Sequence, residues 1–203
     1  MIRTILVDLG NVLIDFDHTI AAKRISQFCG KTPQEIFDLF FASDVTMRFE
    51  AGTISPQEFY LGVKEMLDLR LSFDSFVPIW NDIFFLTAKN RAAYSLMNTL
   101  KDNYRVALIS NINVLHYEYL QKRYPVFNVF HEVFTSCALG CVKPDHAIYR
   151  KTLEALGSEP QDVFYTDDRE DLVESARQLG IHGFVFKDVE TLKADLLGAG
   201  VTI

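Results

Sequence analysis

Thr4-Ile5-Leu6-Val7-Asp8-Leu9-Gly10-Asn11 opens the chain with an apolar run that stops at an acid and a glycine. Four β-branched or apolar residues bounded by a turn signal predict a short buried strand. A parallel sheet binds its ligands at the carboxyl ends of its strands, and Asp8 stands at such an end. Burying a charge costs several kcal/mol unless the charge is paired or metal-bound. Asp8 is therefore a candidate functional residue, although a turn aspartate that accepts backbone N–H bonds would look the same in isolation.

The bulk composition is that of an ordinary globular protein. Of the 203 residues, 49% are hydrophobic and 23% are charged, which permits a sizeable core in one or two domains. The formal net charge of −7 gives no electrostatic reason to expect a nucleic acid or an anionic membrane as a partner. An anionic substrate would thus need a local attraction, such as a metal ion or a helix N-terminus.

Cysteine usage and the N-terminal sequence bear on the compartment. Cys29, Cys137 and Cys141 form no tight pairing pattern, and we interpret them as free thiols of a reducing compartment. The N-terminus lacks the basic start and the apolar stretch of a secretory signal. No apolar segment approaches the ~20 residues that a membrane span requires. We therefore expect a cytoplasmic protein, whose oligomeric state does not follow from the sequence.

Five apolar segments and the helical patterns between most of them predict an open α/β fold. We expect strands at about 4–8, 105–110, 132–135, 162–166 and 183–186, and helices at about 89–102, 113–122, 146–156, 170–180 and 189–197. Alternation of strand and helix is typical of a doubly wound parallel, Rossmann-like sheet with right-handed crossovers. In such a sheet the first strand is central, between the second and the fourth.

One connection is far longer than a crossover helix requires. About a hundred residues separate the first two strands, and they carry helix-start signals of their own. Thr32-Pro33-Gln34-Glu35 and Ser55-Pro56-Gln57-Glu58 are capping boxes with proline at the first helical position. We interpret residues 16–86 as an inserted helical cap over the C-terminal edge of the sheet, and residues 1–15 and 87–203 as the α/β core.

Two further segments are expected to bring polar groups to the edge of the sheet at which Asp8 lies. Ser110-Asn111 follows the second strand, where a hydroxyl and backbone N–H groups can donate to an oxyanion. Lys143 lies in the stiff loop Gly140-Cys141-Val142-Lys143-Pro144, and its ammonium group would neutralise phosphate oxygens as a point charge. Taken alone, an ordinary turn and an ordinary surface lysine would look the same.

Val163-Phe164-Tyr165-Thr166-Asp167-Asp168 runs from an apolar strand directly into two carboxylates, and Asp171 follows. Like charges this close repel each other, and a hard cation relieves the repulsion. Mg²⁺ prefers one or two carboxylates with water and phosphate oxygens, so Asp8 and Asp167 would suffice to hold it. An acid-rich helix start that complements the helix dipole is the alternative for Asp168 and Asp171.

Acid, hydroxyl, lysine and acid pair thus recur at the ends of successive βα units, so folding would bring them to one edge. This four-part pattern resembles the haloacid dehalogenase-like hydrolase superfamily, most of whose members are phosphohydrolases. The resemblance covers nearly the whole chain. Within the superfamily, Asp8-Leu9-Gly10-Asn11-Val12 and Phe49-Glu50-Ala51-Gly52-Thr53-Ile54-Ser55 are most similar to the bacterial sugar-1-phosphate phosphatase group, which includes alpha-D-glucose-1-phosphate phosphatase.

The resemblance implies a phosphatase of small monoesters, such as sugar phosphates. Asp8 would be the nucleophile that forms an aspartyl-phosphate. Ser110 and Asn111 would hold the phosphoryl oxygens. Lys143 would stabilise charge on both Asp8 and the phosphate.

The resemblance also implies a metal site. Asp167 would bind Mg²⁺ together with Asp8 and the backbone carbonyl of Gly10. Asp171 would orient Lys143. Arg169, beside the acid pair, is expected to form a salt bridge with one of its acidic neighbours rather than to contact phosphate.

Gly10 departs from most phosphatases of the superfamily, which carry there a second aspartate that protonates the leaving alcohol and activates water. Positioned acid–base catalysis contributes roughly 10²–10⁴-fold, so its loss should slow the reaction. A more acidic leaving group, such as an anomeric or aryl hydroxyl, would lessen the loss. A substitute acid is the other solution, and the candidates are Asp15, Asp17, His18 and Glu50.

Two alternative functions stay open. A carbon–halogen hydrolase of the 2-haloacid dehalogenase type would also lack the second aspartate, but it needs no metal and generally lacks the pair Asp167-Asp168. A catalytically degenerate protein that binds a phosphorylated ligand is supported by Gly10 alone. In every case the cap would decide which leaving group fits, and its candidate contacts are Met47, Arg48, Glu50 and Trp80.

Overall fold

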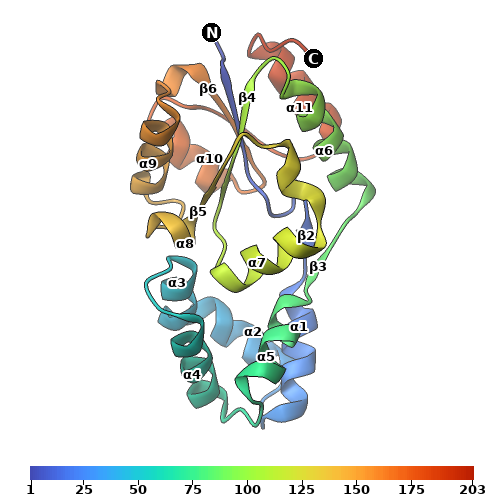
Figure 1. The fold of residues 1–203 in the computed structure, drawn as a ribbon, viewed down its shortest axis with the longest axis vertical. Coiled ribbons are helices and arrows are strands. Elements are labelled where there is room, and N and C mark those ends of the chain that lie inside the picture. Colours follow the sequence, from blue (N-terminus) through green and yellow to red (C-terminus); the bar gives the residue numbers. More distant parts are fainter.

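The computed structural model describes residues 1–203, apart from the side chains of residues 41 and 42. A five-stranded parallel sheet forms the upper half of the molecule in Figure 1. In spatial order its strands are β5 (Glu132–Thr135), β4 (Arg105–Ser110), β1 (Thr4–Val7), β6 (Val163–Asp167) and β7 (His182–Val185). The first strand is central and pairs with β4 and β6, as predicted. The carboxyl ends of these three strands therefore meet at one edge.

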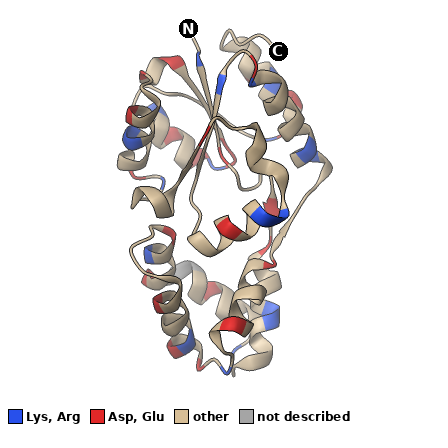
Figure 2. Ribbon diagram, viewed as in Figure 1, with Lys and Arg blue, Asp and Glu red and all other residues tan. Residues whose placement is uncertain are grey.

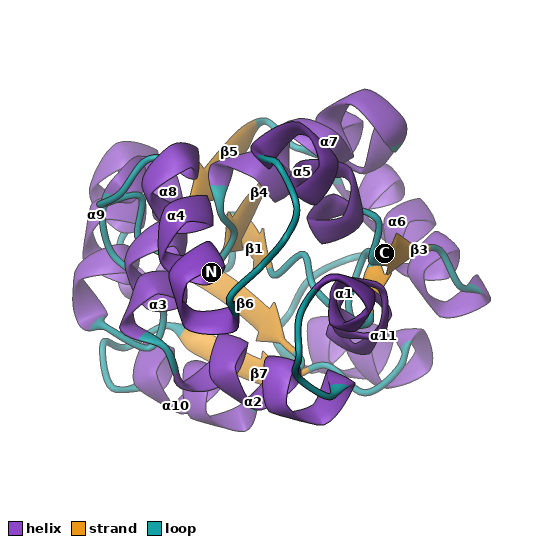
Figure 3. Cartoon of the chain, turned by 90° about the horizontal axis from the view of Figure 1, so that it is seen from below, coloured by secondary structure: helices purple, strands orange, loops and turns teal.

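Helices cover both faces of the sheet, which Figure 3 shows end on. The alternation of side chains along β1 decides which face each helix covers. Ile5 and Val7 pack with α6 (Ala88–Leu100) and α11 (Val189–Gly198), whereas Leu6 packs with α9 (His146–Leu156) and α10 (Glu170–Arg177). All four residues of β1 are buried, as in a strand covered on both sides. None of the described helices combines the length and apolar character needed to cross a bilayer.

The chain between β1 and β4 forms a second group of helices with its own apolar core. A two-stranded antiparallel ribbon of β2 and β3 joins this group to the sheet. The elements are β2 (Asp15–Phe16), α1 (His18–Ile25), a 3₁₀ turn (Ser26–Phe28), α2 (Pro33–Ala42), α3 (Asp44–Glu50), α4 (Pro56–Leu67), α5 (Phe73–Asn81) and β3 (Phe84–Phe85). Phe59, Phe76 and Trp80 are fully or almost fully buried there. We call these helices the cap, and the predicted division at residues 15 and 86 stays a prediction.

Local capping signals place the cap helices as predicted. Thr32 and Ser55 each accept a backbone N–H bond from the glutamate three residues on, and that glutamate accepts the cap residue's own N–H. These reciprocal bonds satisfy two otherwise unpaired donors at each helix start. On the face shown in Figure 2, acidic and basic residues are interspersed along the helices of both halves.

Short elements differ from the sequence expectation. The segment from Ser136 to Leu139, for which no helix was predicted, is the one-turn helix α8, which ends at Gly140 in the left-handed conformation (φ 73°). The ribbon of β2 and β3 was not predicted either. Elements of two to four residues are too short to show a hydrophobic period. The three cysteines are free thiols, as expected.

The core helix α7 (Val114–Arg123) connects the sheet to the cap through a buried histidine. The His116 ring stacks on Trp80 of α5, with centroids 5.0 Å apart. Its Nε2 lies 3.1 Å from the Trp80 carbonyl oxygen and its Nδ1 lies 3.1 Å from the Asn113 amide nitrogen. A neutral imidazole satisfies both contacts, one as donor and one as acceptor. Burial, helped by the nearby His18, lowers the pKa of His116 to about 3.

This histidine should make the protein sensitive to acid. Below its ordinary pKa of 6.5 the unfolded chain protonates His116, whereas the folded chain does not until about pH 3. As the pH is lowered from 6.5 to about 3, the free energy of unfolding should therefore decrease by up to about 1.4 kcal/mol per pH unit. Urea unfolding at pH 7.5 and pH 5 should show a smaller loss for His116→Gln than for the wild type. Equal losses would contradict the assignment.

Candidate active site

The predicted polar residues meet in a cavity of about 270 Å³ between the sheet edge and the cap. The sheet side of its wall contains Asp8, Ser110, Asn111, Lys143, Asp167 and Asp168. Each follows or ends a central strand, except Lys143, which comes from the loop after α8. Folding thus brings together groups that are up to 160 residues apart in the chain.

Lys143 lies at the centre of this group and is only 3% exposed. Its Nζ donates to Asp8 Oδ1 and to Asp167 Oδ2, each at 2.6 Å. It also lies 3.3 Å from the Ile109 carbonyl and from the Tyr165 hydroxyl. Burial alone would lower the pKa of Lys143, but the two carboxylates outweigh burial and raise it. The lysine is therefore a permanent cation inside the site.

The pKa values of the two carboxylates bound to Lys143 are shifted in opposite directions. Burial raises the pKa of Asp8 to about 7 against the pull of Lys143, and Asp167 raises it further. Burial acts on Asp167 in the same direction, but Lys143, the Tyr165 hydroxyl and the Arg169 N–H all stabilise its charge and lower its pKa. Asp167 is thus the fixed anion of the pair.

Asp168 brings a third carboxylate into the cluster. One oxygen from each of Asp8, Asp167 and Asp168 lies within 4.8 Å of the others. Asp168 Oδ2 accepts a 2.8 Å bond from the Asn11 side-chain amide. Lys143 is the one cation hydrogen-bonded to Asp8 and Asp167 among the described residues, so the cluster carries excess negative charge. Hard oxygen ligands with excess negative charge fit Mg²⁺ well.

Asn111 has a structural task that was not predicted. Its Oδ1 accepts the Lys143 backbone N–H and its Nδ2 donates to the Lys143 carbonyl, both at 2.8 Å. The side chain therefore fixes the loop from which Lys143 reaches Asp8. The expected contact of Asn111 with phosphoryl oxygens stays a prediction, as does that of Ser110.

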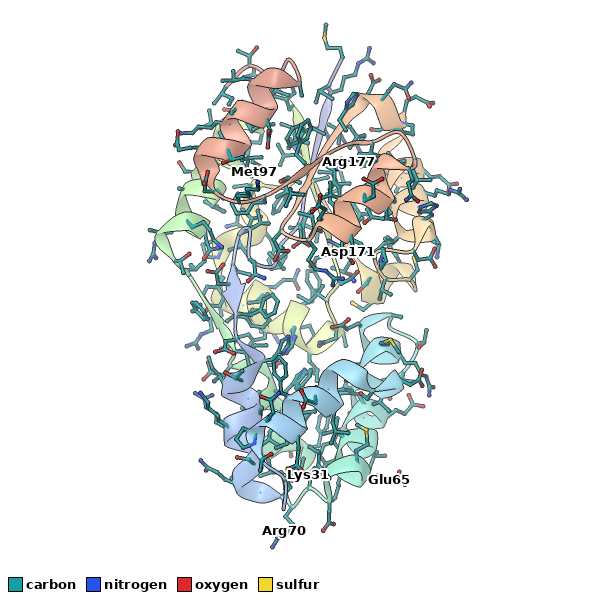
Figure 4. All side chains as sticks on the ribbon, turned by 180° about the vertical axis from the view of Figure 1, so that it is seen from behind. Lys31, Glu65, Arg70, Met97, Asp171 and Arg177 are labelled. Atoms are coloured by element: carbon teal, nitrogen blue, oxygen red, sulfur yellow. The ribbon has the colours of Figure 1, made fainter. Side chains whose placement is uncertain are left out.

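The prediction that Asp171 orients Lys143 is wrong. Asp171 pairs with Arg169 at 2.6 Å, and both side chains are more than half exposed. Figure 4 labels Asp171 on α10. The helix begins at Glu170, so its first turn carries Asp171 away from the end of β6. Asp167 makes the predicted contact instead, while Arg169 has the acidic neighbour that was expected for it.

Tyr165 and Asn11 are site residues that sequence reasoning missed. The Tyr165 hydroxyl donates to Asp167, and the Asn11 amide contacts Asp168. Tyr165 precedes Asp167 by two residues on β6, so the period of two places both on one face of the strand. That alternation was a usable signal. Asn11 has a positive φ of 54°, which no pattern in the sequence announced.

Two of the four candidate substitute acids are engaged outside the cavity. Asp15 lies 2.9 Å from the Asn90 amide and 3.2 Å from Lys89 Nζ. Asp17 caps α1 by accepting the Thr19 N–H. The other two candidates, His18 and Glu50, both line the cavity.

Of the predicted cap contacts, Met47, Glu50 and Trp80 line the cavity. Arg48 is not among the described lining residues; its guanidinium lies 3.8 Å from Asp44. Phe40 and Thr46 also line the cavity from the cap.

Removal of Lys143 should leave two buried carboxylates without their shared cation. Lys143→Met is expected to lower the free energy of unfolding at pH 8 by about 3–5 kcal/mol. Asp171→Asn is the matched control and should cost less than about 1 kcal/mol, because its pair is exposed. Urea denaturation of both variants measures the difference. Similar losses would contradict the central place given to Lys143.

Comparisons with known proteins agree with this geometry. A HAD family enzyme of Bacteroides thetaiotaomicron, solved with magnesium and inorganic phosphate, is 28% identical, with 93% of this chain and 96% of that chain covered and a TM-score of 0.81. A 2-haloacid dehalogenase of Pseudomonas syringae, 15% identical with 98% of this chain and 99% of that chain covered and a TM-score of 0.65, shares the fold.

Curated relatives are more distant in length or in sequence. The D-ribitol-5-phosphate phosphatase of B. thetaiotaomicron is 22% identical over 190 residues, with 91% of each chain covered. The drimenol cyclase of Aspergillus calidoustus is 27% identical over 198 residues, so that 97% of this chain spans only 36% of that protein. A family model of haloacid dehalogenase-like hydrolases matches residues 2–180. The chain belongs to the haloacid dehalogenase-like hydrolases.

Proposed function

We propose that this hydrolase is a magnesium-dependent phosphatase of small phosphate monoesters that reacts through Asp8. The contact of Lys143 with both Asp8 and Asp167, beside Asp168, is the observation that carries the proposal. The magnesium and phosphate in the B. thetaiotaomicron neighbour support it, as does the activity named for the ribitol-phosphate relative. The similarity to the sugar-1-phosphate group stays a prediction.

In this reaction Asp8 attacks phosphorus and forms an aspartyl-phosphate, which water then hydrolyses. Lys143 holds the Asp8 carboxylate in place and offsets charge that develops on the phosphoryl oxygens. Ser110 lines the cavity, and its hydroxyl would donate to those oxygens.

Asp8, Asp167, Asp168 and the backbone carbonyl of Gly10 would hold the magnesium. Bound there, Mg²⁺ supplies neutralisation of the phosphate charge. Asp167 already accepts three hydrogen bonds, whereas Asp168 is half-buried and lines the cavity. We therefore add Asp168 to the ligands expected from the sequence.

The size of the cavity supports a small substrate. At about 270 Å³ it lies near the lower end of ligand pockets. Sugar phosphates, including glucose 1-phosphate, are the class we expect. The cluster of Asp8 with Asp167 and Asp168 favours this function over the carbon–halogen hydrolase.

Hydrolysis of p-nitrophenyl phosphate tests the proposal. The wild type should release p-nitrophenol with Mg²⁺ and lose activity in a chelator. Asp8→Asn should lower the rate by about 10³-fold or more because the nucleophile is gone. Asp171→Asn should stay within a few-fold of the wild type, because the exposed Asp171 side chain pairs with Arg169 and not with Lys143. Complete inactivity of the wild type would favour the degenerate binding protein, and metal-free halide release from a 2-haloacid would favour the dehalogenase.

Asp168→Asn should weaken the metal site without removing the nucleophile. We expect the Mg²⁺ concentration for half-maximal activity to rise about tenfold or more, because one anionic ligand is lost. Titration of activity against Mg²⁺ measures the change, and Asp171→Asn again serves as the control. An unchanged midpoint would remove Asp168 from the ligands.

A further inference from the structure

Glu50 is a carboxyl group that the reaction described so far does not use. It is the last residue of α3, and among the described residues that line the cavity it is the one acid from the cap. It therefore faces the same space as Asp8 from the opposite wall. The leaving group of a bound phosphate monoester would occupy that space, since the phosphoryl group must lie at Asp8.

The core fixes the main chain of Glu50. The Ser136 hydroxyl donates to the Glu50 carbonyl at 2.6 Å, and its oxygen accepts the Ile112 N–H at 2.9 Å. Ser136 is fully buried. Ile112 lies two residues after Ser110, so a single hydroxyl links the end of α3 to the loop that carries the expected phosphate donors.

Gly52 lets the turn after α3 approach the core this closely. Its φ is +67°, a conformation that favours glycine. A Cβ at position 52 would lie 2.1 Å from the Cys137 carbonyl oxygen, so any other residue would push the turn away from α8. Glu50-Ala51-Gly52 is thus built to dock against the core, and docking sets where the Glu50 side chain begins.

The other candidate acids fit the task less well. Gly10 has no side chain, and a Cβ there would lie 2.8 Å from the Phe16 ring. Asp15 and Asp17 are engaged elsewhere.

His18 lies against the rings of Phe16 and Trp80, and burial lowers its pKa to about 4. It is neutral near pH 7 and poorly able to deliver a proton. Burial raises the pKa of Glu50, although the charge of Arg169 acts in the opposite direction. The raised pKa favours a carboxyl group that can carry a proton.

We propose that Glu50 is the general acid and base of the phosphatase reaction, in place of the side chain absent at position 10. This inference rests on the proposed function. In the first step the Asp8 oxygen bonds to phosphorus, the bond from phosphorus to the leaving oxygen breaks, and the Glu50 proton passes to that oxygen to give the free alcohol. In the second step the Glu50 carboxylate takes a proton from water as the water oxygen bonds to phosphorus, and Asp8 is released.

The test is the dependence of Glu50→Gln on the leaving group. Alkyl leaving groups need the proton, whereas p-nitrophenolate leaves without it. With Mg²⁺ present, kcat/KM for ribitol 5-phosphate or another active alkyl phosphate should fall about 10²–10⁴-fold, and kcat/KM for p-nitrophenyl phosphate by less than about tenfold. Because the second step also loses its base, p-nitrophenol should appear in a burst before slow turnover.

Glu65→Gln is the matched control, because Glu65 lies exposed at the far end of the cap from the sheet, as Figure 4 shows. It should leave both substrates unchanged. Equal losses on alkyl and aryl substrates, with a lowered melting temperature, would assign Glu50 a structural role and overturn the proposal. A selective alkyl loss in His18→Gln but not in Glu50→Gln would transfer the task to His18. A wild type without Mg²⁺-dependent phosphatase activity would instead sink the proposed function itself.

Discussion

The buried ion triad of Asp8, Lys143 and Asp167 is the constraint on which the rest of the site depends. Contact with the two carboxylates stabilises the charge of a lysine so deeply buried. Each partner comes from a different segment, so the contact fixes β1, β6 and the loop after α8 relative to one another. Two further contacts hold the triad in place. The Asn111 side chain forms two hydrogen bonds with the Lys143 backbone, and the Tyr165 hydroxyl donates to Asp167.

The triad also explains why the chain needs further positive charge. Asp168 adds a third carboxylate within 4.8 Å, and one ammonium group cannot balance three acids. A divalent cation bound there would balance the excess negative charge.

Periodic features of the fold were predictable, and features set by single contacts were not. The five strands, the helices after β4 and the capping boxes at Thr32 and Ser55 all show a repeating or local signal that acts within a few residues. The start of α10 was predicted, but the side chain of Asp171 pairs with Arg169, and no period in the sequence reports that contact. The two amide bonds of Asn111 depend on a loop 32 residues away, which no local pattern reports.

The same distinction applies to the candidate acids. Four were chosen because they lie near the nucleophile or in the motif around Glu50, and only their contacts in the fold separate them. Asp15 contacts Asn90 and Lys89. Asp17 caps α1, and His18 packs against Phe16 and Trp80. The likeness to the sugar-1-phosphate group rests on two segments, residues 8–12 and residues 49–55, and the second contains Gly52. The structure gives that segment a physical meaning, since its glycine allows the approach to Cys137.

The single hydroxyl of Ser136 has a wider consequence. A movement of α3 away from α8 would break the bond from the Ser136 hydroxyl to the Glu50 carbonyl. The same movement would carry the Glu50 carboxyl group away from Asp8. Entry of bulk solvent and withdrawal of the proton donor would then be one event. Opening of the cap would therefore also inactivate the enzyme.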